Sequence, residues 1–512
     1  MRSWRHVAVS TVTLAALAAC SIGPADSGGG ADGGSAGGTI RVGVSSLPPG
    51  QGNPYTGIGA QSIYTWSAVF DPLTMVDSAG HPKPWLATSW KNVDDKTWRF
   101  ELRDDVTFSN GEKFDAAAVK ATIDYLTSDA GKASVVGAEL GMLDSAKVVD
   151  AHTIDVQTKV PEAILPSKLS AMYVVAPKAW EELGADGFAA KPVGTGPFAI
   201  TSVTGDRIKA KAFKDSWRKP KADKLEVIKL AESAARLQAL QSKQVDLGIA
   251  LAPDQVEAIK SSGAQLQDTP APQVMAFGFV GIDKKSPIND PKVRLALNHA
   301  VDKKAIANNL LAGLGRPATQ GATPESFGYN PEIKGYEYDP EKARKLLAEA
   351  GHAKGLTLNA TITVGSFPAD GEIYQAAADY LKKVGVTLKL ETVQFSTWLE
   401  RYQDSSWTTE MFNQSWNLAP VGDASRPALI YSCQKPKPFF CDRSLDPLLK
   451  SINSEFDPAK REKLLHQLAE ANAKNPPSLL LVEQVDLNAT SSNTAGYDIT
   501  SRFIRYEKIT VR

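Results

Sequence analysis

The chain has 512 residues, of which 43% are hydrophobic and 22% are charged, with 57 basic and 57 acidic side chains. This length and apolar content are enough for two or three domains with buried cores. The balanced charge, without a basic stripe or an aromatic RNA-binding motif, argues against a nucleic-acid partner. The longest apolar runs of the body, such as residues 276–282, fall far short of the roughly 20 residues that a membrane-spanning helix needs.

The N-terminus has the layout of a secretory signal. Arg2 and Arg5 precede a short apolar stretch at residues 7–16, which is the order of a charged region and an apolar core. The following Leu17-Ala18-Ala19-Cys20 resembles a bacterial lipobox. The resemblance implies that residues 1–19 are cleaved off and that Cys20 carries a diacylglyceryl group. The alternative is an ordinary signal in which the cysteine is incidental.

The stretch after Cys20 is predicted to be a flexible tether. Residues 21–38 read SIGPADSGGGADGGSAGG, a composition that cannot build a core and leaves the backbone free. Such a spacer would let a folded body reach a partner at the same membrane. No second linker of this kind divides the rest of the chain, which predicts domains assembled from interleaved segments.

The body alternates strand-like and helix-like segments and therefore predicts an α/β fold. Residues 39–44 form the expected first strand. Residues 97–103 alternate, with Trp98, Phe100 and Leu102 on one face, which predicts a half-buried strand. The turn Thr204-Gly205-Asp206 predicts a hairpin between residues 198–203 and 207–213. Further strands are expected at residues 225–230, 245–249, 274–280, 356–364, 386–393 and 411–416.

Helices of the second half begin with a repeated signal. Asp290, Asp339 and Asp457 each precede a proline, which places an N-cap acceptor before a proline at the first helical position. After Asp339, apolar residues recur at helical spacing until Gly351, which predicts the helix end.

Two cysteines remain in the body, Cys433 and Cys441. In an exported protein they are predicted to form a disulfide that closes a short loop rich in proline and lysine. The alternative is a metal or redox pair, which the absence of a Cys-x-x-Cys spacing disfavours.

No catalytic or metal-binding constellation is recognisable. The six histidines are too widely spaced for a local metal site, so no metal and no cofactor are expected. The run Gly313 to Ala318 has the letters of a dinucleotide fingerprint, but Pro317 and the helix-like residues 303–311 before it predict a turn. There is no Walker loop and no Gly-x-Ser-x-Gly elbow. Pairs of carboxylates across the fold cannot be read from spacing, which leaves a glycosidase open.

Several blocks follow one another along the chain: residues 84–90 (PWLATSW), 97–103 (TWRFELR), 106–114 (VTFSNGEKF), 193–198 (VGTGPF), 237–247, 293–303 (VRLALNHAVDK), 313–318 and 338–351. In this order they resemble the family 5 solute-binding proteins of bacterial ABC importers, the receptors for dipeptides, oligopeptides and nickel. The resemblance covers nearly everything from Thr39 to the C-terminus.

The resemblance implies a bilobal α/β fold of the large periplasmic-binding-protein type, with three domains and a ligand cleft between the lobes. Ligand binding would close the lobes by a hinge motion and create a surface for the membrane permease. The implied domains are I (39–75, 191–281 and 488–512), II (76–190) and III (282–487).

In peptide-binding relatives, the strand that ends near Ser415-Trp416-Asn417 pairs with the ligand backbone, so these three residues are predicted to bind ligand. Trp416 would form an aromatic wall, and we expect Trp416→Ala to weaken binding without altering the unfolding of the free protein. Relatives of the dipeptide type hold the ligand ammonium with an aspartate where this chain has Ala419, and a second acid where it has Gly422.

The arginine that holds the ligand carboxylate in such relatives would belong near residues 364–368, which read Val-Gly-Ser-Phe-Pro. Without these charges an ordinary dipeptide is disfavoured, because a buried zwitterion would lack its partners. Asp423 and Arg426 are predicted as substitute anchors. Residues 58–60 (Ile58, Gly59 and Ala60) complete the predicted site on the other lobe.

The sequence thus predicts a lipid-anchored substrate-binding protein, not an enzyme, on the outer face of the cytoplasmic membrane or in the periplasm. Its expected partners are a small solute, a peptide or peptide-like molecule in first place, together with an ABC permease and ATPase, and the protein is expected to be a monomer. Alternatives are a non-peptide ligand (an oligosaccharide, opine, metal chelate or haem), a surface receptor or adhesin that no longer serves transport, and a secreted hydrolase.

Overall fold

The structure is a computed structural model that describes residues 37–281, 283, 285–433 and 437–512. The predicted signal, Cys20 and nearly all of the predicted tether lie outside these residues. Within the described residues, no helix is long and apolar enough to cross a membrane.

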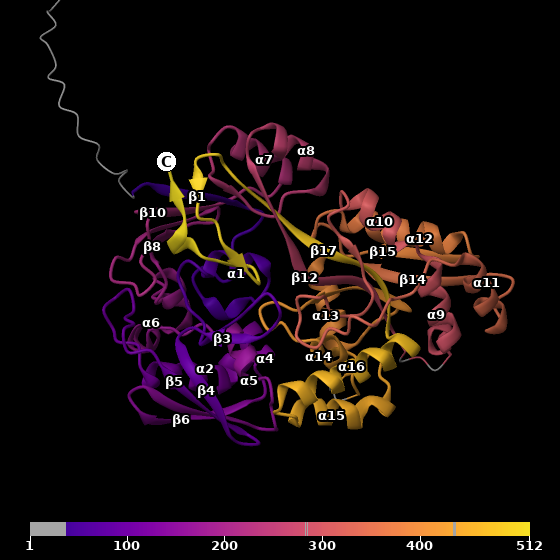
Figure 1. The fold of residues 1–512 in the computed structure, drawn as a ribbon, viewed down its shortest axis with the longest axis horizontal. Coiled ribbons are helices and arrows are strands. Elements are labelled where there is room, and N and C mark those ends of the chain that lie inside the picture. The colour runs from indigo at the N-terminus through magenta and orange to yellow at the C-terminus, as the bar shows by residue number, and fades with distance from the viewer. Residues whose placement is uncertain (1–36, 282, 284, 434–436) are drawn as a thin grey trace, which may run out of the picture. The chain divides into compact units, whose positions relative to one another are not determined.

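One large sheet runs through the molecule and carries strands from distant parts of the sequence (Figure 1). Two long antiparallel strands, β12 and β17, lie in its middle and separate two groups of strands that we call the first and the second lobe. The strands in spatial order are β15 (Val386–Thr392), β14 (Leu356–Ile362), β16 (Met411–Asn417), β12 (Gln265–Phe279), β17 (Ser478–Thr490), β11 (Leu247–Gly248), β1 (Thr39–Val44), β10 (Lys224–Lys229), β9 (Arg207–Ala212) and β8 (Phe198–Val203), and β13 (Arg316–Pro317) pairs with β17.

The first lobe contains the β11 to β8 end of the large sheet and a separate antiparallel sheet of four strands. The separate sheet consists of β4 (Ala87–Asp94), β5 (Thr97–Leu102), β7 (Thr153–Thr158) and β6 (Leu143–Asp150), and β2 (Thr74–Val76) pairs with β3 (Pro82–Pro84). The helices are α1 (Ala60–Trp66), α2 (Ala116–Thr127), α3 (Asp129–Lys132), α4 (Val135–Glu139), α5 (Leu165–Lys168), α6 (Pro177–Ala190), α7 (Ser233–Gln241) and α8 (Val256–Ser261).

The predicted strand and hairpin of this lobe are confirmed. Trp98, Phe100 and Leu102 form the buried face of β5, and β8 and β9 pair as an antiparallel hairpin. Gly194 and Gly196 lie against the backbone of Val69, where an added Cβ would clash.

The second lobe contains β15, β14 and β16 with helices around them. The helices are α9 (Pro291–Ala300), α10 (Lys303–Leu310), α11 (Pro340–Glu349), α12 (Asp370–Lys382), α13 (Phe395–Asp404), α14 (Ser425–Ile430), α15 (Asp446–Ser454) and α16 (Pro458–Lys474). The three predicted caps are confirmed, because the side chains of Asp290, Asp339 and Asp457 each accept a hydrogen bond from a backbone N–H in the first turn. Gly351 follows α11 with a φ of +88°, as a helix-ending glycine does.

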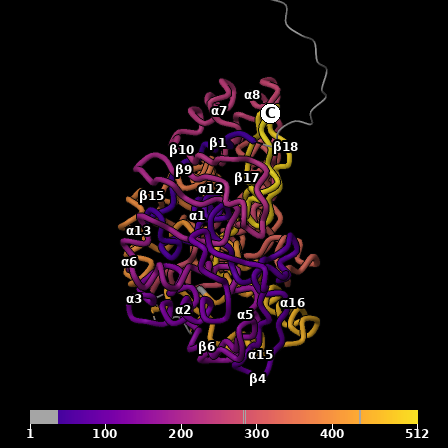
Figure 2. Tube along the Cα trace, turned by 90° about the vertical axis from the view of Figure 1, so that its left-hand side faces the viewer, coloured from indigo at the N-terminus to yellow at the C-terminus, as the bar shows by residue number. Residues whose placement is uncertain are grey.

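The chain crosses back to the first lobe at its end. After β17, short strands pair in two hairpin-like ribbons, and the last of them lies in contact with β1 (Figures 1 and 2). They are β18 (Thr494–Ala495), β19 (Ile499–Thr500), β20 (Phe503–Ile504) and β21 (Thr510–Val511). Segments from both ends of the chain therefore build one lobe.

A buried ionic network joins three segments of the first lobe. Arg218 donates to Asp71 at 3.0 Å and to Glu507 at 2.7 Å, and Trp85 Nε1 donates to Asp71 at 2.8 Å. The guanidinium lies 5.3 Å from the centre of the Trp85 ring. Because removal of one partner would leave a buried charge unpaired, this network holds residues 71–85, 218 and 507 in one arrangement.

Candidate ligand-binding site

Strand β16 of the second lobe has a partly open edge on the side of β14. On one side it pairs with β12 along its full length, from Met411↔Phe279 to Asn417↔Gln273. On the other side β14 pairs only with Met411 and Phe412. Residues 413–417 have no second strand partner among the residues that the structure describes, and such an edge can accept an added strand.

The backbone groups at this edge belong to Ser415 and Asn417. Leu418 N donates to Pro272 O at 2.8 Å, and main-chain groups of successive residues in an antiparallel strand point to alternate sides. The N–H and C=O of Trp416 therefore face β12, and those of Ser415 and Asn417 face the open side. An extended ligand could pair with these two residues.

The side chains of Ser415 and Asn417 lie on one face of the sheet and join a polar network. Gln273 donates to Ser415 Oγ, and Arg502 Nη1 donates to Asn417 Oδ1 at 3.3 Å. Arg502 also makes two hydrogen bonds to Asp486, at 2.7 and 2.9 Å, and one to Gln273 at 2.7 Å.

Burial alone would lower the pKa of Arg502, but Asp486 and Tyr64 together outweigh burial and hold this pKa above its ordinary value. The guanidinium is thus a permanent charge that is already neutralised. The network ties β12, β17 and the C-terminal segment together at the open edge.

The three predicted residues of the first lobe lie at the start of α1. Gly59 is exposed, and a Cβ added there would meet no atom within 4 Å. Ile58 and Ala60 pack partly against the core of the first lobe. In the second half of the same helix, burial and then the Asp486 carboxylate raise the pKa of Tyr64. Helix α1 therefore meets the polar network at Tyr64.

Trp416 points to the opposite face of the sheet and is only 3% exposed. Its ring packs edge-on against Tyr431 at 4.9 Å, and both residues line a cavity of about 70 Å³ between the sheet and α14 to α16. Truncation of an aromatic residue buried to this degree costs about 3–5 kcal/mol. The expectation that Trp416→Ala leaves unfolding unaltered is therefore wrong, because the ring is also part of the core.

Asp423 is engaged in a buried ion pair. Arg461 donates to its two carboxylate oxygens at 2.7 and 3.0 Å, and the hydroxyl of Ser425 donates to it at 2.6 Å. Burial would raise the pKa of Asp423, but the Arg461 guanidinium and the hydrogen bonds from Ser425 together outweigh burial and lower it. In this arrangement, the carboxylate supports the loop between β16 and α14.

Arg426 joins the two lobes. Its Nη2 donates to Glu139 Oε2 of α4 at 3.0 Å, while its Nη1 is buried and has no hydrogen-bond partner in the described part of the chain. Sequence reasoning missed Glu139, since nothing in the sequence connects two residues 287 positions apart.

Helix α13 carries an aromatic row that sequence reasoning also missed. The rings of Phe395 and Trp398 lie 5.9 Å apart at 11°, and those of Trp398 and Tyr402 lie 5.0 Å apart at 12°. Trp398 is 6.2 Å from Phe412 of β16, so the row borders the strand with the open edge. The spacing i, i+3, i+7 of these aromatic residues was the signal that could have indicated a helical stripe.

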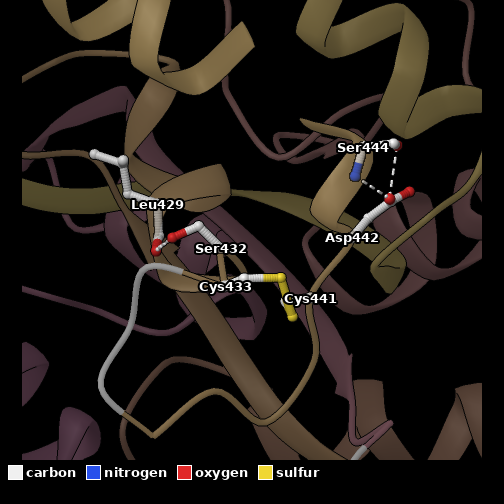
Figure 3. Close-up of a disulfide and its surroundings, with 6 residues drawn as sticks. All are labelled: Leu429, Ser432, Cys433, Cys441, Asp442 and Ser444. Atoms are coloured by element: carbon white, nitrogen blue, oxygen red, sulfur yellow. Dashed lines mark hydrogen bonds between the residues drawn. A yellow bond between two sulfur atoms is a disulfide. The ribbon is translucent and has the colours of Figure 1, made fainter. Parts of the chain in front are cut away.

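The structure contains the disulfide between Cys433 and Cys441, with a Cα–Cα distance of 5.0 Å (Figure 3). On one side of it, Ser432 Oγ donates to Leu429 O at 2.9 Å at the end of α14. On the other side, Asp442 accepts hydrogen bonds from the N–H and hydroxyl of Ser444. The disulfide holds this segment beside the aromatic cluster of Tyr431 and Phe439.

In the described residues, no three His, Cys, Asp or Glu side chains gather as a metal site. The continuous sheet and the two strands shared by both lobes define a two-lobed architecture, which is typical of proteins that bind a ligand where the lobes meet.

Comparison with known proteins agrees with this class. Residues 81–437 match the family described as bacterial extracellular solute-binding proteins, family 5 Middle. The glutathione-binding protein GsiB of Salmonella typhimurium is 26% identical over 462 residues, which cover 87% of this chain and 89% of GsiB.

Among solved structures, DppA from Helicobacter pylori in complex with the peptide STSA has a TM-score of 0.79 at 23% identity, covering 93% of this chain and 98% of DppA. CtaP from Listeria monocytogenes has a TM-score of 0.82 at 18% identity, covering 93% and 99%. The chain belongs to the family 5 bacterial extracellular solute-binding proteins. The predicted family and bilobal α/β fold are thereby confirmed.

Proposed function

We propose that this protein is a lipid-anchored receptor that captures a peptide or peptide-like solute between its lobes and delivers it to an ABC permease. The observation that carries this proposal is the open edge of β16 at residues 413–417. An extended ligand with backbone amides satisfies such an edge. The names of GsiB, a glutathione-binding protein, and of DppA with a bound peptide favour the same ligand class.

A hinge in the two central strands supports capture by closure. In β12, the pairing with β17 changes register between Pro270 and Val274 and again before Ala276. Register shifts interrupt the ladder and let a strand bend. The first shift spans the start, at Gln273, of the stretch of β12 that pairs with β16, and the second lies inside that stretch. Closure that is favoured by the ligand would give the permease a conformation to recognise.

The domain boundaries remain part of the proposal. Segments 39–75, 191–281 and 488–512 form domain I, residues 76–190 form domain II and residues 282–487 form domain III. The four-stranded sheet of residues 87–158 and the return of β18 to β21 to β1 favour this division. We further propose a monomer without a cofactor, metal or nucleic-acid partner.

The ligand role of the open edge is tested by Ser415→Pro, with Ser415→Ala as its control. Proline removes the N–H that faces the open side, while the ladder between Trp416 and β12 stays intact. Native mass spectrometry of the freshly purified protein identifies the retained small molecule, and calorimetry then measures its affinity. We expect Ser415→Pro to lose at least tenfold in affinity and Ser415→Ala to bind within a few-fold of the unaltered protein. Equal affinities of both variants would refute the site.

Anchoring is tested separately by Cys20→Ala. The variant should leave the membrane fraction and be found in the soluble extracytoplasmic fraction, because the thiol that would carry the lipid is removed. Persistent membrane association of the variant would refute the lipid anchor without bearing on the ligand site.

A further inference from the structure

The charged side chains around the open edge of β16 are already paired. Arg502 is neutralised by Asp486, and Asp423 by Arg461. Arg426 is paired with Glu139 through Nη2, and its buried Nη1 has no hydrogen-bond partner in the described residues. Each of the three pairs joins residues of opposite charge.

The loop at residues 364–368 is held by a further charge. Asp370 accepts hydrogen bonds from the N–H groups of Gly365, Ser366 and Phe367, at 2.8–3.1 Å, and from Gly371 N. On the other side of the strand ends, Arg401 is paired with Glu391. The carboxylates among these charges all bind partners within the protein, which leaves no counter-charge for a ligand ammonium.

Neutral polar groups beside the edge lack partners. Gln414 and Trp416 are 6% and 3% exposed, and Gln414 Oε1 and Trp416 Nε1 have no hydrogen-bond partner in the described residues. The same holds for Trp398 Nε1 on α13. Buried donors and acceptors are normally satisfied, so one acceptor and two uncharged donors remain for a ligand.

An apolar surface adjoins these groups at the carboxyl ends of β14 and β15. Phe395 and Leu399 of α13 are 60% and 36% exposed, and Val364 after β14 is 50% exposed. The ends of the two strands are neighbours, because they pair in parallel up to Ile362↔Thr392. Ligands of α/β sheets gather outside the carboxyl ends of parallel strands, and an exposed apolar patch there marks a binding surface.

We propose that the ligand is a peptide-like molecule, without a free ammonium at the bound segment, that places an aromatic or aliphatic group on Phe395 and Leu399 of α13. End-blocked and cyclic peptides have this chemistry. The inference rests on the proposed function and adds the ligand's charge and side chain. The reason is complementarity: amides satisfy the open edge and the neutral groups, whereas an ammonium would be desolvated without a counter-charge.

Calorimetry with three probes tests the charge rule. N-acetyl-Ala-Phe-Ala-amide should bind at least tenfold tighter than the free tripeptide Ala-Phe-Ala, and glutathione should not bind measurably. Equal or tighter binding of the free tripeptide or of glutathione overturns the inference and leaves the proposed function standing. Absence of binding by all three probes also overturns it, and a ligand retained in native mass spectrometry then decides whether the proposed function survives.

Two variants on one helix test the apolar subsite. Phe395→Ala should lower the affinity for N-acetyl-Ala-Phe-Ala-amide at least fivefold. It should lower the affinity for N-acetyl-Ala-Ala-Ala-amide less than twofold. Glu400→Ala, on the exposed opposite face of α13, should leave both affinities unchanged. The thermal midpoints of both variants should match the unaltered protein, since both side chains are exposed. Equal weakening of both probes by Phe395→Ala would assign the residue a structural role and overturn the subsite.

Discussion

Lys303 is a buried cation without a salt-bridge or hydrogen-bond partner in the described part of the chain. Its Nζ is unpaired and lies 4.9 Å from the centre of the Tyr336 ring. Burial lowers the pKa of Lys303 from its ordinary value to about 7. A lysine with a depressed pKa binds fewer protons in the folded than in the unfolded protein, so this residue makes stability rise with pH between about 7 and 10.5.

Lys303→Met should therefore stabilise the protein at pH 7, because a side chain of similar length removes the desolvation cost. The gain should be a few kcal/mol at about 1.4 kcal/mol per unit of pKa shift, less about 0.5–1 kcal/mol for the lost contact with Tyr336. Urea unfolding at pH 7 and pH 10 measures it. The advantage of the variant should shrink at pH 10, and an equal advantage at both values would contradict the assigned pKa.

Individual anchors were the part of the site least accessible to sequence reasoning. The pattern around residues 415–417 indicated the strand and its position, because backbone pairing follows from the element. It could not indicate the roles of Asp423 and Arg426, since their partners Arg461 and Glu139 lie 38 and 287 positions away. A side chain's role depends on the charge that faces it, which only the folded chain reveals.

At the scale of elements, local sequence signals predicted where helices begin better than they predicted how long strands are. The aspartate-proline caps gave correct helix starts because a cap is a local hydrogen bond. The strand predicted at residues 274–280 extends instead over Gln265–Phe279. The added part contains Pro270 and Pro272, which cannot donate to a ladder, and the register shift after Pro270 lets the strand continue past them.

The disulfide between Cys433 and Cys441 gives an element-scale prediction. It closes a loop across eight positions, for which constraint of the unfolded chain contributes about 2–3 kcal/mol. The variant with serine at both positions should lose this amount in urea unfolding, and the reduced unaltered protein should lose as much. A loss well below 1 kcal/mol would show that the bond adds no constraint.

At the scale of the whole molecule, the lobes are connected by contacts that can exist only when they are close together. Backbone Ala163 N of the first lobe donates to Asn453 O of the second at 2.9 Å, and Trp98 packs 5.8 Å from Phe456. The Arg426–Glu139 ion pair is the charged member of this set. Under the proposed closure mechanism, ligand affinity depends on the fraction of closed molecules, and such contacts would tune binding from outside the ligand site.

Charge reversal of the Arg426–Glu139 pair distinguishes two roles of Arg426: holding the lobes together and contacting the ligand directly. Arg426→Glu places two carboxylates together and should disfavour closure, while the double variant Arg426→Glu with Glu139→Arg restores the attraction. The pair is partly exposed, so it contributes about 0.2–1 kcal/mol, or up to roughly fivefold in affinity. Calorimetry with the retained ligand should show a lower affinity for the single variant and a restored affinity for the double variant. The unfolding midpoints of both variants should be unchanged. If the double variant stays as weak as the single one, Arg426 touches the ligand itself, because reversing Glu139 cannot replace a lost guanidinium contact.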